Sequence, residues 1–168
     1  MAEPVITDVP AQARLLLHCA SADRSAMAGA LALDLPEAML RAGHARGWHA
    51  LHLSPDEWLL IGSPDEAAAL VARSASDGSA IAHSLVDIGE RHLGVTVAGE
   101  GAADLLNAGC ALDLSDDAFP VGACTRTLFG KADILLWRPT EAPAFRVEYA
   151  RSFADYVRRL MSAASADL

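Results

Sequence analysis

Hydrophobic positions in the first half of the chain alternate between the spacing of strands and the spacing of helices. Short apolar runs bounded by turn residues predict strands, whereas segments rich in Ala, Met and Leu predict helices. Ser63, Pro64 and Glu66 form a helix start, because the serine can cap the helix, the proline suits its first turn and the glutamate completes a capping box. In chain order the pattern predicts strand 14–19, helix 22–33, strands 48–53 and 57–61, helix 63–73 and strand 80–87. This β-α-β-β-α-β order is typical of a ferredoxin-like unit.

The second half of the chain alternates in the same way but in a different order. Leu93, Val95 and Val97 alternate with small or polar residues, as in a half-buried strand. Ser152 is predicted to cap a last helix that frays after about residue 163. The apolar face of that helix is predicted to comprise Phe153, Tyr156, Val157, Leu160 and Met161. The other elements are predicted as strand 93–97, helix 102–109, and strands 121–129, 134–137 and 145–149.

The absence of an evident linker predicts that the two halves form one folding unit. We therefore expect an α+β fold of two small packed lobes within a single unit over 1–168. Lobe one covers about 10–89 with the ferredoxin-like order, and lobe two covers about 90–164 with the order β-α-β-β-β-α.

The composition excludes several classes of function. The chain has 168 residues, of which 52% are hydrophobic, so it is far too apolar for intrinsic disorder. Its 13 basic and 22 acidic residues give a net charge of −9, which disfavours nucleic-acid binding. No apolar run reaches the roughly 18 residues of a membrane helix, and the acidic N-terminus is not that of a signal peptide. Three scattered cysteines predict free thiols and a cytoplasmic location.

Few residues are candidates for reaction chemistry. His49 and His52 lie three apart on a predicted strand, hence on opposite faces, so no metal site is expected. Cys110 follows a predicted helix end, where the helix dipole disfavours a thiolate. Cys124 has Arg126 on the same strand face, which leaves a thiol enzyme as an alternative, although packing is the favoured interpretation of both cysteines. The ring of Trp58 suits either an internal core or a partner's surface.

Six sequence motifs carry a family resemblance. The longest reads AFPVGACTRTLFGKADILLW over 118–137, and it is preceded by LSPDEWLL over 53–60, VDI over 86–88 and LLNAGCALDL over 105–114. FRV over 145–147 and RSFADY over 151–156 follow it. In order and spacing, from about residue 10 to the C-terminus, these motifs resemble the gamma subunit of heterotetrameric sarcosine oxidase.

The resemblance implies a non-catalytic small subunit that supports assembly of an oxidoreductase complex. That complex oxidatively demethylates sarcosine to glycine, with hydrogen peroxide and with methylenetetrahydrofolate or formaldehyde as products. The alpha, beta and delta subunits are the implied partners. FAD, FMN, NAD, zinc and tetrahydrofolate are implied for the complex, and none of them is expected to be bound by this chain. The implied fold is similar to the folate-binding lobes of aminomethyltransferases, the T proteins of glycine cleavage.

Asp133 is the one residue to which the resemblance gives a cofactor role. Aminomethyltransferases carry an acidic pair after a Gly-Gly turn, where it acts on the folate amine. The matching segment here is 129–133, which has a shorter turn and a single acid, Asp133, as the folate-side analogue. No catalytic or metal-binding residue is transferred. A stand-alone folate-binding protein of the aminomethyltransferase type is the alternative function.

Overall fold

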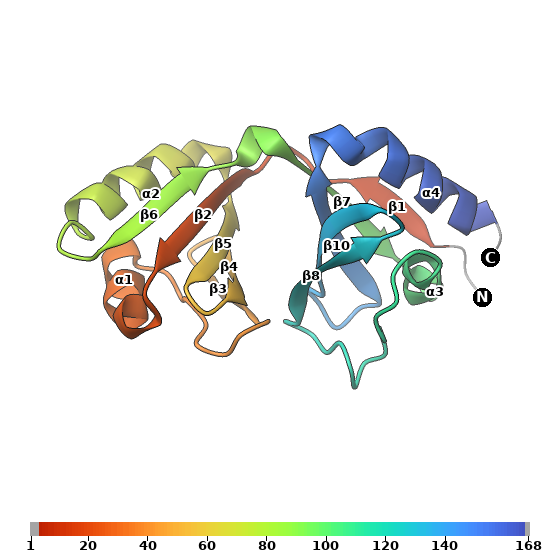
Figure 1. The fold of residues 1–168 in the computed structure, drawn as a ribbon, viewed down its shortest axis with the longest axis horizontal. Coiled ribbons are helices and arrows are strands. Elements are labelled where there is room, and N and C mark those ends of the chain that lie inside the picture. Colours follow the sequence, from red (N-terminus) through yellow and green to blue (C-terminus); the bar gives the residue numbers. More distant parts are fainter. Residues whose placement is uncertain (1–3, 167–168) are drawn as a thin grey trace. The chain divides into compact units, whose positions relative to one another are not determined.

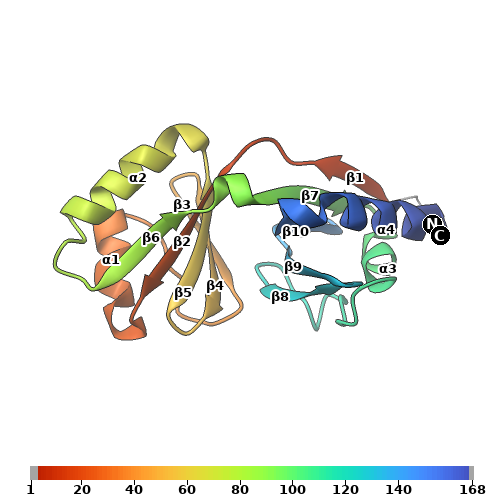
Figure 2. The ribbon, with the colours of Figure 1, turned by 45° about the horizontal axis from the view of Figure 1, so that its top comes forward.

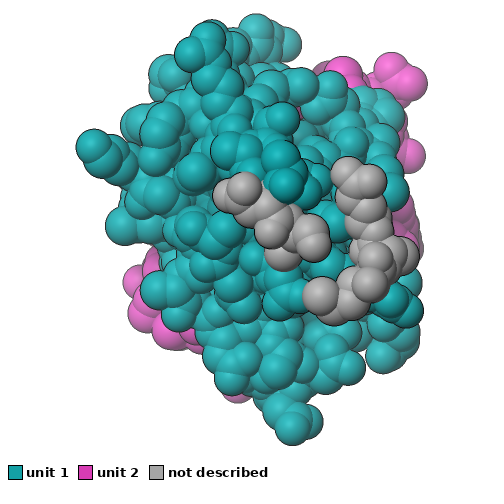
Figure 3. All heavy atoms as spheres, turned by 90° about the vertical axis from the view of Figure 1, so that its right-hand side faces the viewer, with its two compact units in different colours: residues 1–10, 90–168 teal, residues 11–89 magenta. Residues whose placement is uncertain are grey.

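The chain folds as two compact units, each built on a five-stranded antiparallel sheet. The computed structural model describes residues 4–166. Unit 1 combines residues 1–10 with 90–168, and unit 2 comprises residues 11–89 (Figures 1 and 3). In each unit, helices pack on one face of the sheet (Figure 2). The predicted α+β class is thereby confirmed. Each unit has one strand more than the sequence predicts.

Unit 2 has the predicted ferredoxin-like order with an added edge strand, β3 (Ala42–Ala45). This strand pairs with its successor through a turn at Arg46 and Gly47, whose φ angles of 52° and 77° match a tight hairpin turn. The sequence pattern missed it because Ala, Gly and His carry little strand signal. The remaining elements of unit 2 are β2 (Ala13–Cys19), α1 (Arg24–Leu31), β4 (Trp48–Ser54), β5 (Glu57–Gly62), α2 (Pro64–Ser76) and β6 (His83–Asp87). The sheet order is β3-β4-β5-β2-β6.

Both faces of the unit 2 sheet are apolar. On the helix side, Met27 and Leu31 of α1 and Leu70 of α2 pack with strand residues such as Leu17 and Leu60 in one buried cluster. Alternate residues of β4 and β5 on the other face are buried as well, namely Leu51, Leu53, Leu59 and Ile61. Burial on both faces explains why these strands are continuous hydrophobic runs in the sequence.

The start of α2 agrees with the predicted cap but not with the predicted capping box. The Ser63 hydroxyl accepts a hydrogen bond from the Asp65 amide at 3.3 Å. The Glu66 carboxylate accepts instead from the Trp48 indole nitrogen, at 3.0 Å. The expected contact from Glu66 back to Ser63 is therefore replaced by one that ties the helix to β4.

Unit 1 has the predicted β-α-β-β-β-α order, preceded by an N-terminal edge strand, β1 (Val5–Asp8). The sheet order is β1-β7-β10-β9-β8. Strand β8 starts at Cys124 and not at 121, because Gly122 turns the chain with a φ of 79°. The remaining elements are β7 (His92–Ala98), α3 (Ala102–Asn107), β8 (Cys124–Phe129), β9 (Ala132–Trp137), β10 (Ala144–Ala150) and α4 (Ala154–Ala166).

The last helix differs from its prediction in three respects. Ser152 lies within a short 3₁₀ turn, Arg151–Phe153, so it does not act as the predicted cap. Helix α4 continues to Ala166 and does not fray after about 163. Only part of the predicted apolar face is in the core. Val157 and Met161 are buried, whereas Phe153 and Tyr156 are 37% and 38% exposed.

Strand β1 is held to unit 1 by the sheet ladder and by α4. All four of its residues pair with β7, from Val5 opposite Ala98 to Asp8 opposite Val95. The Arg158 guanidinium of α4 also contacts the Asp8 carboxylate at 2.6 Å. This exposed ion pair adds little by itself, so the ladder is the main attachment. Within residues 4–166, no helix is long and apolar enough to span a membrane.

The buried phenol of Tyr149 lies near that ion pair. Its ionisation makes the stability of unit 1 fall at alkaline pH. Burial raises the pKa of Tyr149, and the Arg158 guanidinium opposes this shift only in part. The unfolded chain thus loses this proton at lower pH than the folded chain. The contribution to stability is complete below the ordinary pKa of about 10 and is lost as pH rises through the folded pKa.

We predict that Tyr149→Phe weakens the pH dependence of stability. Between about pH 9 and 11, the melting temperature of the wild type should fall more steeply than that of the variant, because phenylalanine has no proton to lose. Thermal unfolding followed by circular dichroism at several pH values measures this slope. Tyr156→Phe, at a partly exposed tyrosine of α4, is the matched control. Equal slopes for Tyr149→Phe and the wild type would contradict the assignment.

Candidate functional site

Asp133 is exposed on the second position of β9. Its cross-strand neighbour is Leu128 of β8, which is 51% exposed. Directly opposed residues project from the same face of a sheet, so the carboxylate lies beside an aliphatic side chain. The role of Asp133 as the folate-side residue stays a prediction.

The turn before Asp133 is shaped by glycine. Gly130 has a φ of 60°, and Phe129 pairs directly with Ala132, so the β8–β9 hairpin has a two-residue loop. A Cβ atom on Gly130 would lie 2.7 Å from a methyl carbon of Leu160 in α4. The hydroxyl of Tyr156 accepts a hydrogen bond from the Lys131 amide at 3.0 Å. The turn is therefore packed tightly onto α4.

All three cysteines are free and buried. Cys124 is fully buried, and Cys110 is 3% exposed with its sulfur 3.8 Å from the Thr127 hydroxyl. Burial raises the pKa of the Cys19 thiol, and the nearby Asp23 and Asp56 raise it further. Low exposure opposes nucleophilic chemistry at each position, and packing is the interpretation that the structure supports.

The histidines take part in separate local contacts. The ring of His44 lies 4.4 Å from that of His49 on the neighbouring strand, and His52 stacks on Trp58 at 4.4 Å. Within residues 4–166, no group of three or more His, Cys, Asp or Glu side chains is arranged to hold a metal ion.

Ser74, which carries no sequence signal, and His83 are hydrogen-bonded to each other. The Ser74 hydroxyl of α2 lies 2.5 Å from His83 Nε2, and His83 Nδ1 lies 2.8 Å from the carbonyl oxygen of Ile81. A carbonyl only accepts, so Nδ1 carries the proton and the hydroxyl donates to Nε2. This resembles a nucleophile and its oriented base. Ser74 is only 3% exposed, however, so the pair secures the end of α2 against β6.

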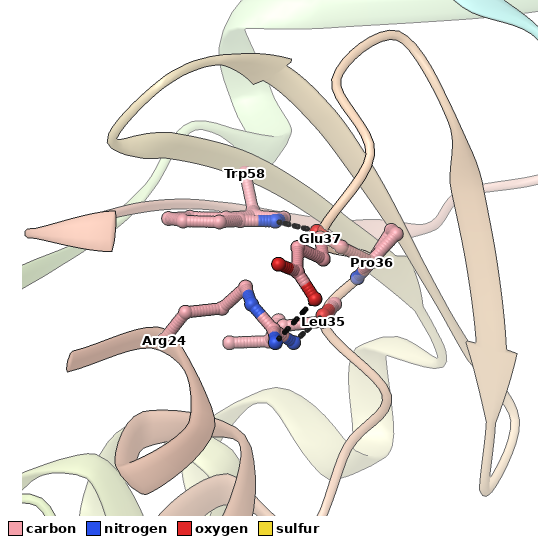
Figure 4. A network of polar contacts seen from close by, with 5 residues as sticks. All are labelled: Arg24, Leu35, Pro36, Glu37 and Trp58. Carbon is pink, nitrogen blue, oxygen red and sulfur yellow. Dashed lines mark hydrogen bonds and ion pairs between the residues drawn. The ribbon is translucent and has the colours of Figure 1, made fainter. Parts of the chain in front are cut away.

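Trp58 belongs to the internal core of unit 2. The side chain is fully buried, and its indole nitrogen donates to the Pro36 carbonyl oxygen at 3.1 Å. Arg24 of α1 donates to the Leu35 carbonyl at 2.7 Å and to the exposed Glu37 carboxylate at 3.4 Å (Figure 4). These bonds fasten the segment after α1 over the sheet. The ring is therefore not available to a partner.

A buried ion pair lies on the sheet face of unit 1 opposite the helices. Arg146 and Glu148 of β10 are 8% and 1% exposed, and Arg146 Nε donates to the Glu148 carboxylate at 2.7 Å. A Cβ atom on the facing Gly94 of β7 would lie 2.6 Å from that carboxylate, so glycine leaves the space for the pair. The sequence signal for this ion pair was an alternation of apolar and charged residues, which places both charges on one face of the strand. It comprises Phe145, Arg146, Val147, Glu148 and Tyr149.

Known proteins resemble the chain in sequence and in fold. The sequence model of the sarcosine oxidase, gamma subunit family matches residues 18–167. No curated protein sequence matches the chain.

The solved structures with a similar fold include a sarcosine oxidase and an aminomethyltransferase. A chain of the heterotetrameric sarcosine oxidase from Corynebacterium sp. U-96, in complex with pyrrole 2-carboxylate, is 24% identical, with a TM-score of 0.86 over 99% of this chain and 87% of that one. The glycine cleavage system aminomethyltransferase T from Bartonella henselae is 12% identical, with a TM-score of 0.66 over 95% of this chain and 45% of that one. At these identities, the likeness shows the fold alone.

We predict that Glu148→Gln destabilises the chain by about 3 kcal/mol, because it removes the charged acceptor of the hydrogen bond from the buried Arg146 guanidinium. Urea unfolding followed by circular dichroism measures the change in free energy. The double variant Arg146→Met with Glu148→Leu is the control and should recover most of the loss, since both buried charges are then gone. A single variant as stable as the wild type would show that the pair is unimportant for folding.

Proposed function

This chain belongs to the sarcosine oxidase gamma subunit family, and on that premise we propose that it is the non-catalytic small subunit of a heterotetrameric sarcosine oxidase. The family match over residues 18–167 is the observation that carries the proposal. Its fold likeness to a chain of the Corynebacterium enzyme over nearly its whole length is consistent with it. We propose that the subunit supports assembly of the complex.

The side chains of the described residues favour a supporting role over a reactive one. The free thiols and the Ser74 hydroxyl are buried, where a substrate could not reach them. A catalytic nucleophile must be reachable and must have its base beside it. The chemistry of the complex is thus assigned to the other subunits.

The proposal includes the reaction and the partners that the family resemblance implies. The complex would demethylate sarcosine oxidatively to glycine with hydrogen peroxide, and the one-carbon unit would leave as methylenetetrahydrofolate or formaldehyde. Alpha, beta and delta subunits would be the partners and would hold the FAD, FMN, NAD and zinc. We propose the cytoplasm as the location, because free thiols are typical of a reducing compartment.

We predict that this chain co-purifies with the alpha, beta and delta chains. All four should be co-expressed and captured through an affinity tag on this chain, then separated by size exclusion at moderate salt. A stable hetero-complex is expected, because an obligate subunit buries a large apolar interface. Recovery of this chain alone, while the other three assemble without it, would contradict the proposal.

The alternative function is a stand-alone folate-binding protein, which the fold likeness to aminomethyltransferase T favours. In that case Asp133 would face the pterin. We predict that isothermal calorimetry detects no micromolar binding of tetrahydrofolate to the isolated chain, since Asp133 lacks a second acid and lies exposed beside Leu128. Micromolar binding that Asp133→Asn abolishes and Asp155→Asn preserves would establish the alternative instead.

A further inference from the structure

Two histidine rings lie next to each other on the edge hairpin of unit 2. His44 of β3 is directly opposite His49 of β4, so both side chains project from the same face of the sheet. Their ring centroids are 4.4 Å apart, and their planes are inclined by 38°. His44 is exposed and His49 is half-buried, so the pair is open to solvent. Strand β3, which the sequence pattern missed, thus gives His49 a histidine neighbour.

The hairpin holds the two rings in place. A two-residue turn at Arg46 and Gly47 joins the strands, and its positive φ angles of 52° and 77° fix the pairing on either side. Trp48, beside His49 in β4, is 4% exposed, and its indole nitrogen donates to the Glu66 carboxylate at 3.0 Å. This contact anchors β4 in unit 2. The two imidazoles are therefore brought together by folding, before any ligand binds.

The distance between the rings suits two imidazoles bound to one metal ion. With a metal–nitrogen bond of about 2.0 Å, each ring centroid lies about 3.2 Å from the metal. Two such centroids are about 4.5 Å apart when the coordination angle is a right angle, and about 5.2 Å apart at the tetrahedral angle. The observed 4.4 Å therefore matches a right angle, which is the geometry of tetragonal Cu²⁺ and Ni²⁺ and not of tetrahedral Zn²⁺.

We propose that His44 and His49 form a bidentate site for a divalent transition-metal ion, with Cu²⁺ preferred. Neutral imidazole is a common metal ligand, and Cu²⁺ binds such ligands more tightly than the other divalent first-row metals. The protein supplies two ligands and water fills the remaining positions, so the bound ion exchanges with solvent. The site lies within unit 2 and depends neither on the proposed function nor on the other subunits.

Substitution of single histidines tests the site in the full-length chain, purified without a polyhistidine tag. His44→Gln and His49→Gln each remove one imidazole, and His18→Gln is the matched control at an exposed histidine of β2. Calorimetric titration with Ni²⁺ measures the affinity without oxidising the thiols. Electron paramagnetic resonance of bound Cu²⁺ counts its nitrogen ligands. Because the net charge of −9 attracts cations to other places as well, the nitrogen count identifies the site where affinity alone does not.

The wild type should bind one Cu²⁺ through two nitrogen atoms. His44→Gln and His49→Gln should each weaken Ni²⁺ binding about 100-fold, since a linked pair of ligands gains that much over a single one, and should leave one nitrogen on Cu²⁺. His18→Gln should match the wild type in both measurements. A wild type without the two-nitrogen spectrum, or unchanged affinity in both variants, would overturn the site and show that the rings only stack. If circular dichroism shows His49→Gln unfolded, the variant at the exposed His44 decides alone.

Discussion

The pairing of β10 with β7 on one side and β9 on the other determines which side chains of unit 1 can meet. Because successive residues of a strand face opposite sides, one register sends Phe145, Val147 and Tyr149 into the helix-side core and Arg146 and Glu148 to the other face. A shift by one residue would bury both charges among the helices. This register determines the ion pair, the space above Gly94 and the apolar surface on which α4 packs.

The same core determines how α4 is presented. Once Val157 and Met161 pack over the sheet, Tyr156 and Ala163 are left exposed, while Leu160 lies half-buried at the edge of the core, beside the β8–β9 turn. The helix therefore serves both the interior of unit 1 and a surface. The three cysteine thiols and the Ser74 hydroxyl are buried.

Most elements were predictable because their hydrophobic periods are strong. Strands β4, β5, β7 and β10 carry clear apolar runs or alternation, and the cap of α2 has its expected serine. The two missed strands lack that signal: β3 is built of Ala, Gly and His, and β1 is exposed at every residue. In both cases pairing with a stronger neighbouring strand creates the strand. The role of Asp133 came from the family resemblance and stays a prediction.

By itself, the sequence determined the α+β class, the order of most elements, the family and the absence of an evident reactive motif. Local spacing and turn chemistry are enough for these, since they depend on residues close together in the chain. The tertiary structure decided the pairing of Arg146 with Glu148, the burial of Trp58 and Ser74, the hydrogen bond between Ser74 and His83, and the exposure of Tyr156. Each of these depends on contacts between segments far apart in sequence. The hydrophobic period of a helix does not determine which of two apolar stripes the core will cover.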